Sequence, residues 1–161
     1  MLLKLGADTY RKGARERIEE SRELLNCGFY AGSVYLAGRA VEGGLRALIW
    51  INDENIRLGR KALSTGHDIR QLATQVQCLG VFRFTGQASD LTVQLQSIAH
   101  RWVNNMRFVG NEQLDRFWRR TGVIRPKRSS TLKYESRAFY NDCLDALTRF
   151  ETLWNNYPNK T

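Results

Sequence analysis

The sequence predicts an all-α fold, an up-and-down bundle of four to five helices that forms a single domain over residues 1–161. Two observations lead to this fold class. Only two prolines, Pro126 and Pro158, interrupt the chain, so long segments can run as helix without a breaker. Apolar side chains also recur at steps of three and four residues in five segments, which is the spacing of one helix face, whereas no segment has a strong strand pattern.

The first two helices are expected over about residues 8–26 and 30–51. Asp8 or Thr9 can cap the first helix at its N-terminus, and Gly28 can supply the left-handed turn that ends it. The second segment is the most apolar in the chain, which places it at the centre of the bundle. A glycine weakens a helix by roughly 1 kcal/mol relative to alanine, so glycines here predict close approach of neighbouring helices. The second helix contains Gly32, Gly38, Gly43 and Gly44.

The rest of the chain is expected to add three helices. Thr65 and Asp68 have the spacing of a capping box, which marks the start of the third helix. The expected order is a polar loop at 52–64, a helix from Thr65 or His67 to about 79, a connection at 80–87, a helix at about 89–108, an irregular basic loop at about 110–130, and a last helix at about 131–155.

The chain carries a large positive charge. It has 25 basic and 16 acidic residues, which give a formal net charge of +9. Such a surplus favours a polyanion or an acidic partner without specifying which. No stretch of 18 apolar residues could span a membrane, and the N-terminus lacks the apolar region of a signal peptide. We therefore expect a cytoplasmic, unprocessed protein that is not bound to a membrane.

No metal site and no cofactor are predicted. The three cysteines, Cys27, Cys78 and Cys143, lie far apart and form no Cys-x-x-Cys pair, so neither a disulfide framework nor a zinc site is expected. Each is expected to be a buried thiol that behaves as a small apolar side chain. The two histidines and the scattered acidic residues form no ligand cluster. No glycine-rich phosphate loop is present, because Gly43-Gly44 lies within a predicted helix and lacks the following lysine.

Four segments occur in a characteristic order. They are residues 14–21 with 28–30, residues 33–42 with 45–48, Gly66-His67-Asp68-Ile69, and the segment from Trp102 to Arg107-Phe108. Together they resemble the HEPN family, whose third helix starts with a similar Gly-His-Asp-Leu motif. The resemblance implies a helical bundle that acts on or binds RNA or a nucleotide and often forms a homodimer. It also implies a nucleotidyltransferase partner, in a toxin–antitoxin or defence-type system.

The chain departs from the motif of the family's ribonucleases, Arg-x(4–6)-His near the end of a late helix. No histidine follows Arg101 or Arg107. One formal match, Arg60 to His67, spans a loop and the start of a helix, and we interpret it as accidental. Binding of RNA or a nucleotide is therefore the first hypothesis, and metal-independent endoribonuclease activity is the alternative.

The candidate catalytic residues are His100 and Arg107, with His67 as a further candidate. RNA cleavage of this kind needs a group that transfers protons and a cation that stabilises the phosphorane. A spacing of seven residues places His100 and Arg107 on one face of the predicted fourth helix, roughly 10 Å apart along its axis. The alternative for this pair is a polar surface position and an ion pair. The alternative for His67, with Asp68, is helix capping.

Two acidic residues, Glu42 and Asp68, are predicted to have structural roles. Glu42 lies on an apolar helix, and a buried carboxylate must be paired. Its candidate partners are Arg39, Arg46 and Arg107. We expect a structural ion pair at Glu42 and a helix cap at Asp68.

Residues 116–128 form the most distinctive segment for RNA binding, with six basic residues among thirteen. Basic side chains neutralise phosphates, and aromatic rings can stack on unpaired bases. A solvated loop with Trp118 packed into the bundle is an equal alternative. As a third hypothesis for function, the same loop binds an acidic partner in a protein-interaction module. The predicted RNA-binding residues are Arg116, Trp118, Arg119, Arg120, Arg125, Lys127 and Arg128.

Overall fold

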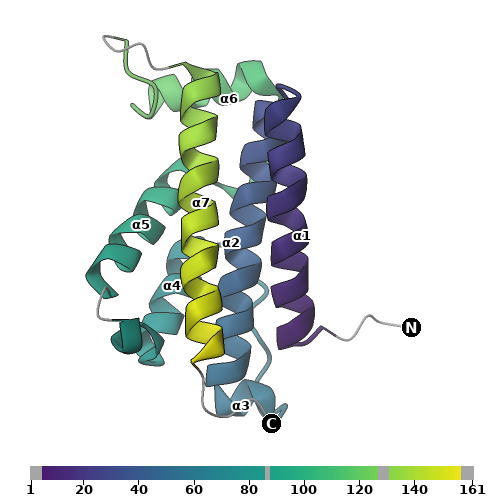
Figure 1. The fold of residues 1–161 in the computed structure, drawn as a ribbon, viewed down its shortest axis with the longest axis vertical. Coiled ribbons are helices and arrows are strands. Elements are labelled where there is room, and N and C mark those ends of the chain that lie inside the picture. The colour runs from purple at the N-terminus through teal and green to yellow at the C-terminus, as the bar shows by residue number, and fades with distance from the viewer. Residues whose placement is uncertain (1–4, 86–87, 127–130, 157–161) are drawn as a thin grey trace.

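Helices make up all the regular structure of the described residues (Figure 1). The computed structural model describes residues 5–85, 88–126 and 131–156, and these contain no strand. The all-α prediction is confirmed, with short helices added between the long ones. In chain order, the α-helices and the 3₁₀ helices η1 and η2 are α1 (Ala7–Asn26), α2 (Tyr30–Asn52), α3 (Glu54–Arg57), α4 (Ile69–Cys78), η1 (Val81–Thr85), α5 (Ala88–Arg101), η2 (Asn104–Phe108), α6 (Asn111–Arg120) and α7 (Leu132–Asn155).

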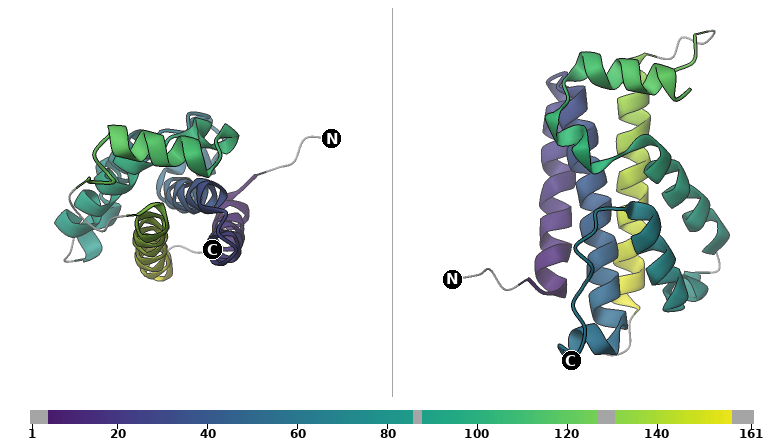
Figure 2. Two further views of the ribbon diagram at one scale, coloured as in Figure 1. Left: turned by 90° about the horizontal axis from the view of Figure 1, so that it is seen from above. Right: turned by 180° about the vertical axis from the view of Figure 1, so that it is seen from behind.

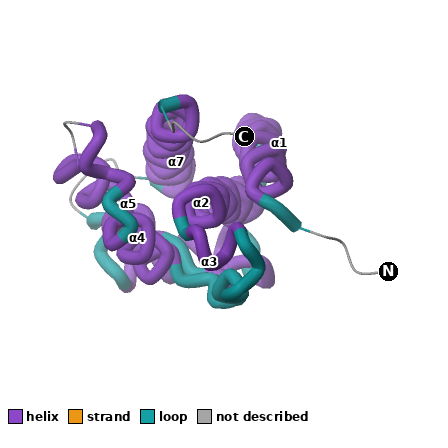
Figure 3. The backbone as a smooth tube through the Cα atoms, turned by 90° about the horizontal axis from the view of Figure 1, so that it is seen from below, coloured by secondary structure: helices purple, strands orange, loops and turns teal. Residues whose placement is uncertain are grey.

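The central helix is α2, as its apolar sequence predicts. It lies between α1 and α7, and α4 packs on its other side (Figures 1 and 3). Most of its side chains are buried, including Val41, Leu45 and Ile49, which are fully buried. The short helix α6 lies crosswise at one end of the bundle, in contact with α2 and α7 (Figures 1 and 2). This arrangement leaves one long face of α6 exposed at the end of the bundle.

The glycines of α2 allow its neighbours to approach closely, which confirms the expectation from the sequence. A Cβ atom at Gly38 would lie 2.2 Å from Nε1 of Trp102, and one at Gly44 would lie 2.6 Å from Cδ2 of Phe150. At Gly43, the nearest atoms belong to α1 and lie 3.3 Å away. Real Cβ atoms do not approach other atoms at the first two distances, so these faces of α2 require glycine.

Two helix starts differ from the prediction. Helix α1 begins at Ala7 after Gly6, so neither Asp8 nor Thr9 caps it. Helix α4 begins at Ile69, and the Asp68 carboxylate accepts a hydrogen bond from the backbone N–H of Arg70 at 2.8 Å. Asp68 is therefore the N-cap itself, and the predicted capping box with Thr65 is wrong.

The predicted polar loop at 52–64 contains the short helix α3. Its cap is Asp53, whose side chain accepts a hydrogen bond from the backbone N–H of Asn55 at 3.1 Å. Ile56, on this helix, is buried against the bundle. One capped turn with a single buried side chain is too short to show helical periodicity, which explains why the sequence did not reveal it.

The predicted fourth helix does not continue to residue 108. Helix α5 ends at Arg101, the backbone is extended at Val103 (φ −137°, ψ 146°), and η2 follows. The break allows the Trp102 indole to pack against Gly38, and its N–H donates to the carbonyl of Tyr35 at 3.2 Å. Tertiary packing of one large side chain therefore outweighs continuation of the helix.

The predicted irregular loop at 110–130 is also wrong, because residues 111–120 form α6. Leu114 and Trp118, one turn apart, are buried and hold the helix on the bundle. The Asn111 side chain accepts from the backbone N–H of Ala31 and donates to the carbonyl of Gly28, both at 2.9 Å. These bonds fix the start of α6 to the turn between α1 and α2. The sequence did not reveal α6, because its apolar face consists of only two residues in a mostly charged segment.

No helix in the described part of the chain is both long and apolar enough to cross a membrane.

Candidate functional site

Trp118 anchors α6 and does not face solvent. Its ring is fully buried and packs against Phe139, with ring centres 6.2 Å apart. Its indole N–H donates to the carbonyl of Arg101 at 3.0 Å. A buried ring with its only donor satisfied cannot stack on a base, so the prediction that Trp118 contacts RNA is wrong. The other outcome considered for the segment, packing of Trp118 into the bundle, is the one observed.

The exposed face of α6 is basic. Arg116 and Arg119 are exposed and form ion pairs one turn back, with Glu112 and with Asp115. Both pairs are open to water and contribute little to stability. The predicted residues Arg120 and Arg125 are also exposed, and neither has an acidic partner among the described residues. The remaining two predicted RNA contacts, Lys127 and Arg128, lie outside the described residues.

Positive charge is concentrated at this end of the bundle, which we call the basic end: α6, residues 121–126 and the first two turns of α7. Its described residues, 112–126 and 131–137, contain six basic and three acidic side chains, a net charge of +3. Lys133 and Arg137, at the start of α7, are exposed as well. A third of the chain's excess charge of +9 therefore lies at this end of the described structure.

A buried carboxylate organises a second polar site. Glu42, on α2, is 2% exposed and accepts hydrogen bonds from Arg39 (2.5 Å) and Arg46 (2.9 Å). Arg46 also donates to the backbone carbonyls of Ser64 (2.5 Å) and Gly66 (2.6 Å), so it holds the segment before α4 against α2. The expected pairing of Glu42 is observed with two of its three candidate partners, and no contact with Arg107 is found.

His67 completes this site, which we call the Glu42 cluster: Arg39, Glu42, Arg46 and His67. Its Nδ1 atom lies 2.9 Å from the Glu42 carboxylate and 2.8 Å from Nη1 of Arg39. A guanidinium only donates and a carboxylate only accepts, so Nδ1 can satisfy only one of these neighbours at a time. With the proton on Nδ1 and directed to Glu42, Nε2 is left as an acceptor.

The Glu42 cluster opens into a cavity of about 320 Å³. Arg39 and His67 are partly exposed there, whereas Glu42 and Arg46 are buried behind them. Two arginines surround one carboxylate, so the cluster has a positive charge even with a neutral imidazole. Chemically, it presents an oriented imidazole and a guanidinium side by side, which suits an anionic group such as a phosphate. The cavity is also lined by Tyr10 and Thr65.

The predicted pair of His100 and Arg107 does not share a helix face. His100 is exposed near the end of α5, whereas Arg107 lies on η2 beyond the extended residue Val103. The guanidinium of Arg107 lies over the ring of Phe108, 4.5 Å from its centre. A spacing of seven residues brings two side chains to one face only within a continuous helix, and this helix ends at Arg101. The prediction that His100 and Arg107 share a helix face is therefore wrong.

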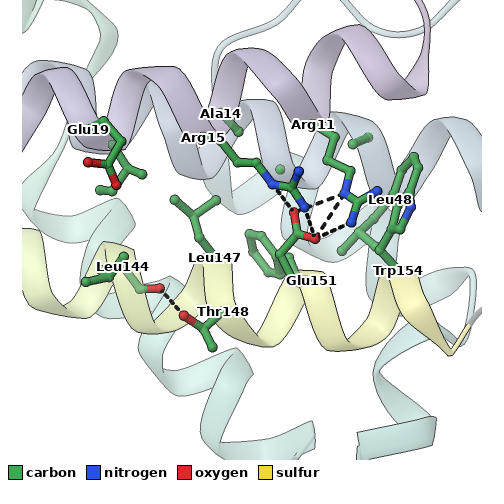
Figure 4. Close-up of a pocket in the computed structure, with 14 residues that line it drawn as sticks. Arg11, Ala14, Arg15, Glu19, Leu48, Leu144, Leu147, Thr148, Glu151 and Trp154 are labelled. Atoms are coloured by element: carbon green, nitrogen blue, oxygen red, sulfur yellow. Dashed lines mark hydrogen bonds and ion pairs between the residues drawn. The ribbon is translucent and has the colours of Figure 1, made fainter.

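A groove between α1 and α7 forms a second cavity, of about 290 Å³ (Figure 4). Its floor is apolar, with Leu48 and Leu147 among its lining residues. Glu151 on α7 accepts hydrogen bonds from Arg11 (2.5 Å) and Arg15 (2.7 Å) on α1. Burial raises the pKa of the Glu151 carboxyl, but the hydrogen bonds from both arginines outweigh this effect and leave its pKa below the ordinary value. The ion pairs of Glu151 with Arg11 and Arg15 therefore bridge α7 and α1 across the groove.

The thiols differ from the prediction at two of three positions. Cys143 is buried, and burial raises the pKa of its thiol well above the ordinary value. Cys27 and Cys78 are exposed, because each lies on the outward side at the end of a helix. In the described ranges, no three histidine, cysteine or acidic side chains gather to hold a metal ion.

Comparison with known proteins finds no matching family model, no significantly similar curated protein and no significantly similar solved structure. Function must therefore be inferred from the geometry of the chain itself.

The pairing of Glu42 with Arg39 and Arg46 was among the possibilities named from the sequence, and the spacing of these residues supports it. Arg39, Glu42 and Arg46 are spaced at i, i+3 and i+7, which places both arginines beside the carboxylate on one helix face. The arrival of His67 from 25 residues away had no comparable signal, because it depends on the path of the loop before α4.

Proposed function

We propose that this protein is a HEPN-like domain that binds RNA through the sugar-phosphate backbone at its basic end. The observation that carries the proposal is the net charge of +3 over the described residues 112–126 and 131–137, which lie together at one end of the bundle. Basic side chains that neutralise phosphates release condensed counterions, and this release supplies much of the affinity for nucleic acids. The anchored helix α6 presents three of these side chains, Arg116, Arg119 and Arg120.

Two arginines are the strongest individual candidates for phosphate contacts. Arg120 and Arg125 are exposed and without acidic partners among the described residues, so binding a phosphate breaks no existing ion pair. Arg116 and Arg119 must exchange a carboxylate for a phosphate, which lowers their net contribution. We therefore expect Arg120 and Arg125 to account for most of the salt dependence that the described residues of the basic end confer.

The test is the binding of a fluorescein-labelled single-stranded RNA of 20 nucleotides, followed by anisotropy from 50 to 300 mM KCl. The double variant Arg120→Glu/Arg125→Glu should bind more weakly, and the slope of log Kd against log salt should fall by about 1.4, since each single-strand contact contributes about 0.7. The matched control is Arg57→Glu/Arg60→Glu at α3, at the opposite end of the bundle, which should keep the full slope.

The two double variants change the charge equally, so net charge alone predicts the same loss for both. Equal loss of affinity in both variants would contradict binding at the basic end. A wild-type protein that binds no RNA would instead support the protein-interaction module, with an acidic partner at the same surface.

The wider proposal places the domain in the cytoplasm, as a homodimer with a nucleotidyltransferase partner in a toxin–antitoxin or defence-type system. It rests on the resemblance of four ordered segments to the HEPN family, and the helical bundle is consistent with it. Analytical ultracentrifugation tests the dimer directly. Co-purification with a nucleotidyltransferase encoded beside it tests the partner.

A second candidate function is metal-independent RNA cleavage at the Glu42 cluster. The observation that favours it is the imidazole of His67 held 2.9 Å from a buried carboxylate and beside a guanidinium. In this function, Nε2 of His67 takes the proton of a ribose 2′-hydroxyl, whose oxygen attacks the adjacent phosphorus; the P–O5′ bond breaks, and the 5′-oxygen leaves with a proton from water. Arg39 stabilises the negative charge on the non-bridging oxygens of the phosphorane. Cleavage of labelled RNA in EDTA that is lost in His67→Ala and kept in His100→Ala would support it.

A further inference from the structure

An exposed aromatic ring adjoins α6 and has no role in the core. Phe108, the last residue of η2, is 76% exposed, more than any other large apolar side chain among the described residues. The guanidinium of Arg107 lies 4.5 Å from the ring centre, so one face of the ring carries a cation. An exposed Phe stabilises no core, and its loss should therefore cost the fold little.

A second exposed ring belongs to a segment that is bonded to the start of α6. Phe29, in the turn between α1 and α2, is 62% exposed. It follows Gly28, whose carbonyl accepts a hydrogen bond from Asn111, the first residue of α6. Phe108 precedes Asn111 by three residues, so both aromatic residues belong to segments that meet at the N-terminal end of α6.

Phe108 lies just before the N-terminal end of α6, whereas the unpartnered Arg120 and Arg125 lie at and beyond its C-terminal end. Helix α6 has ten residues, which corresponds to about 15 Å at 1.5 Å per residue. A single-stranded RNA of a few nucleotides can span this distance. Its backbone would contact Arg120 and Arg125 while its bases reach Phe108.

We propose that Phe108 is a stacking platform for an unpaired base of single-stranded RNA, with Arg107 on the opposite face of its ring. This inference rests on the proposed RNA binding and deepens it, because it names the single strand as the substrate class. Every nucleobase has a π-face that stacks on an aromatic ring, whereas the bases of a duplex are already stacked and paired.

Charge favours RNA over an apolar protein partner at this surface. Arg107 is exposed beside the ring, no acidic residue among those described pairs with it, and the adjacent α6 carries a positive face. An apolar interface would have to bury these cations without partners, which is costly. A polyanion that also offers flat aromatic bases complements both features.

The experiment compares Phe108→Leu, which keeps apolar bulk and removes the π-face, with Phe108→Trp, which enlarges that face. The probes are a labelled single-stranded RNA of 12 nucleotides and the same strand paired in a duplex. Phe108→Leu should weaken single-strand binding on the order of tenfold and leave duplex binding and the salt slope unchanged. Phe108→Trp should restore the affinity. The matched control is Val93→Ala on α5, a similarly exposed apolar side chain.

Each other result overturns the platform. Wild-type affinity in Phe108→Leu, with affinity still lost in Arg120→Glu/Arg125→Glu, removes the platform and keeps RNA binding at the basic end. Equal weakening for single strand and duplex shows a general structural effect, which urea denaturation of the variant would reveal. A change from dimer to monomer in Phe108→Leu assigns the ring to contact between copies. No RNA binding by the wild type removes both proposals.

Discussion

The tightest packing in the fold predicts that Gly38→Ala is strongly destabilising. A Cβ atom at this position would lie 2.2 to 2.5 Å from three atoms of the Trp102 indole. The ring cannot move away easily, because it is buried, its N–H is bonded to the carbonyl of Tyr35, and it stacks on the Tyr35 ring at 6.4 Å between centres. The substitution must therefore displace either Trp102 or α2 itself.

The magnitude follows from two opposing effects. Overpacking of a rigid core costs typically 1–3 kcal/mol, and contacts this short place Gly38→Ala near the upper value, about 3 kcal/mol. Replacing a helical glycine with alanine stabilises the helix by about 1 kcal/mol. The expected net loss is therefore about 2 kcal/mol in the free energy of unfolding.

Gly13→Ala is the matched control, because Gly13 lies within α1 and a Cβ atom there would meet nothing within 4 Å. The free energy of unfolding of Gly13→Ala should rise by about 1 kcal/mol from helix propensity alone. The free energies of unfolding of the two variants should therefore differ by about 3 kcal/mol. Urea denaturation followed by circular dichroism at 222 nm measures both. A Gly38→Ala protein as stable as the wild type would refute the packing of Trp102 on α2 and the helix break after Arg101.

Three further predictions concern buried and paired groups. Glu42→Ala leaves the buried Arg46 without its carboxylate and should cost about 3 kcal/mol in urea denaturation; a loss under 1 kcal/mol would show that the pair is not buried. Glu151 has a lowered pKa in the fold, so its contribution to stability is present above the ordinary value of 4.5 and disappears as pH falls through the folded pKa. The stability difference between wild type and Glu151→Gln, measured at pH 7 and pH 3, should shrink at pH 3, and an unchanged difference would contradict the bridge. Ellman's reagent should modify Cys27 and Cys78 quickly in the native protein and Cys143 only after unfolding. Fast modification of all three thiols in the native protein would contradict the burial of Cys143.

The long helices were predictable because each buries a continuous apolar stripe. Helix α2 shows this most clearly, since its apolar side chains and its glycines both point to a central position. Helix α7 was expected over about 131–155 and is observed over Leu132–Asn155. Helix propensity and tertiary packing agree in these segments, so the local sequence is sufficient to predict the helices.

The short elements were not predictable, because one or two tertiary contacts determine them. Helix α6 depends on the burial of Leu114 and Trp118 and on the hydrogen bonds of Asn111 to the turn between α1 and α2. Most of its other residues are charged or polar, so its sequence shows no extended apolar stripe. The end of α5 depends on where Trp102 finds space beside Gly38. Such contacts connect residues far apart in the chain, and periodicity carries no information about them.

The candidate sites show the same division. The basic residues were visible in the sequence, but Trp118 was assigned to RNA because nothing local separates a buried ring from an exposed one. Arg39 and Arg46 were named as candidate partners of Glu42 because a buried carboxylate must be paired. The contact of His67 Nδ1 with Glu42 could not be predicted, because it depends on the fold. The exposed ring of Phe108 became visible only once the helix was seen to end before it.

The most direct measurement of RNA binding at the basic end is a titration of the isotopically labelled protein with single-stranded RNA, followed by ¹H–¹⁵N NMR. We expect the side-chain Nε–Hε signals of Arg120 and Arg125 and the amides of α6 to shift with added RNA, and those of α3 to stay in place. Shifts centred on α3, or an unchanged spectrum at saturating RNA, would contradict the assignment of this surface to RNA.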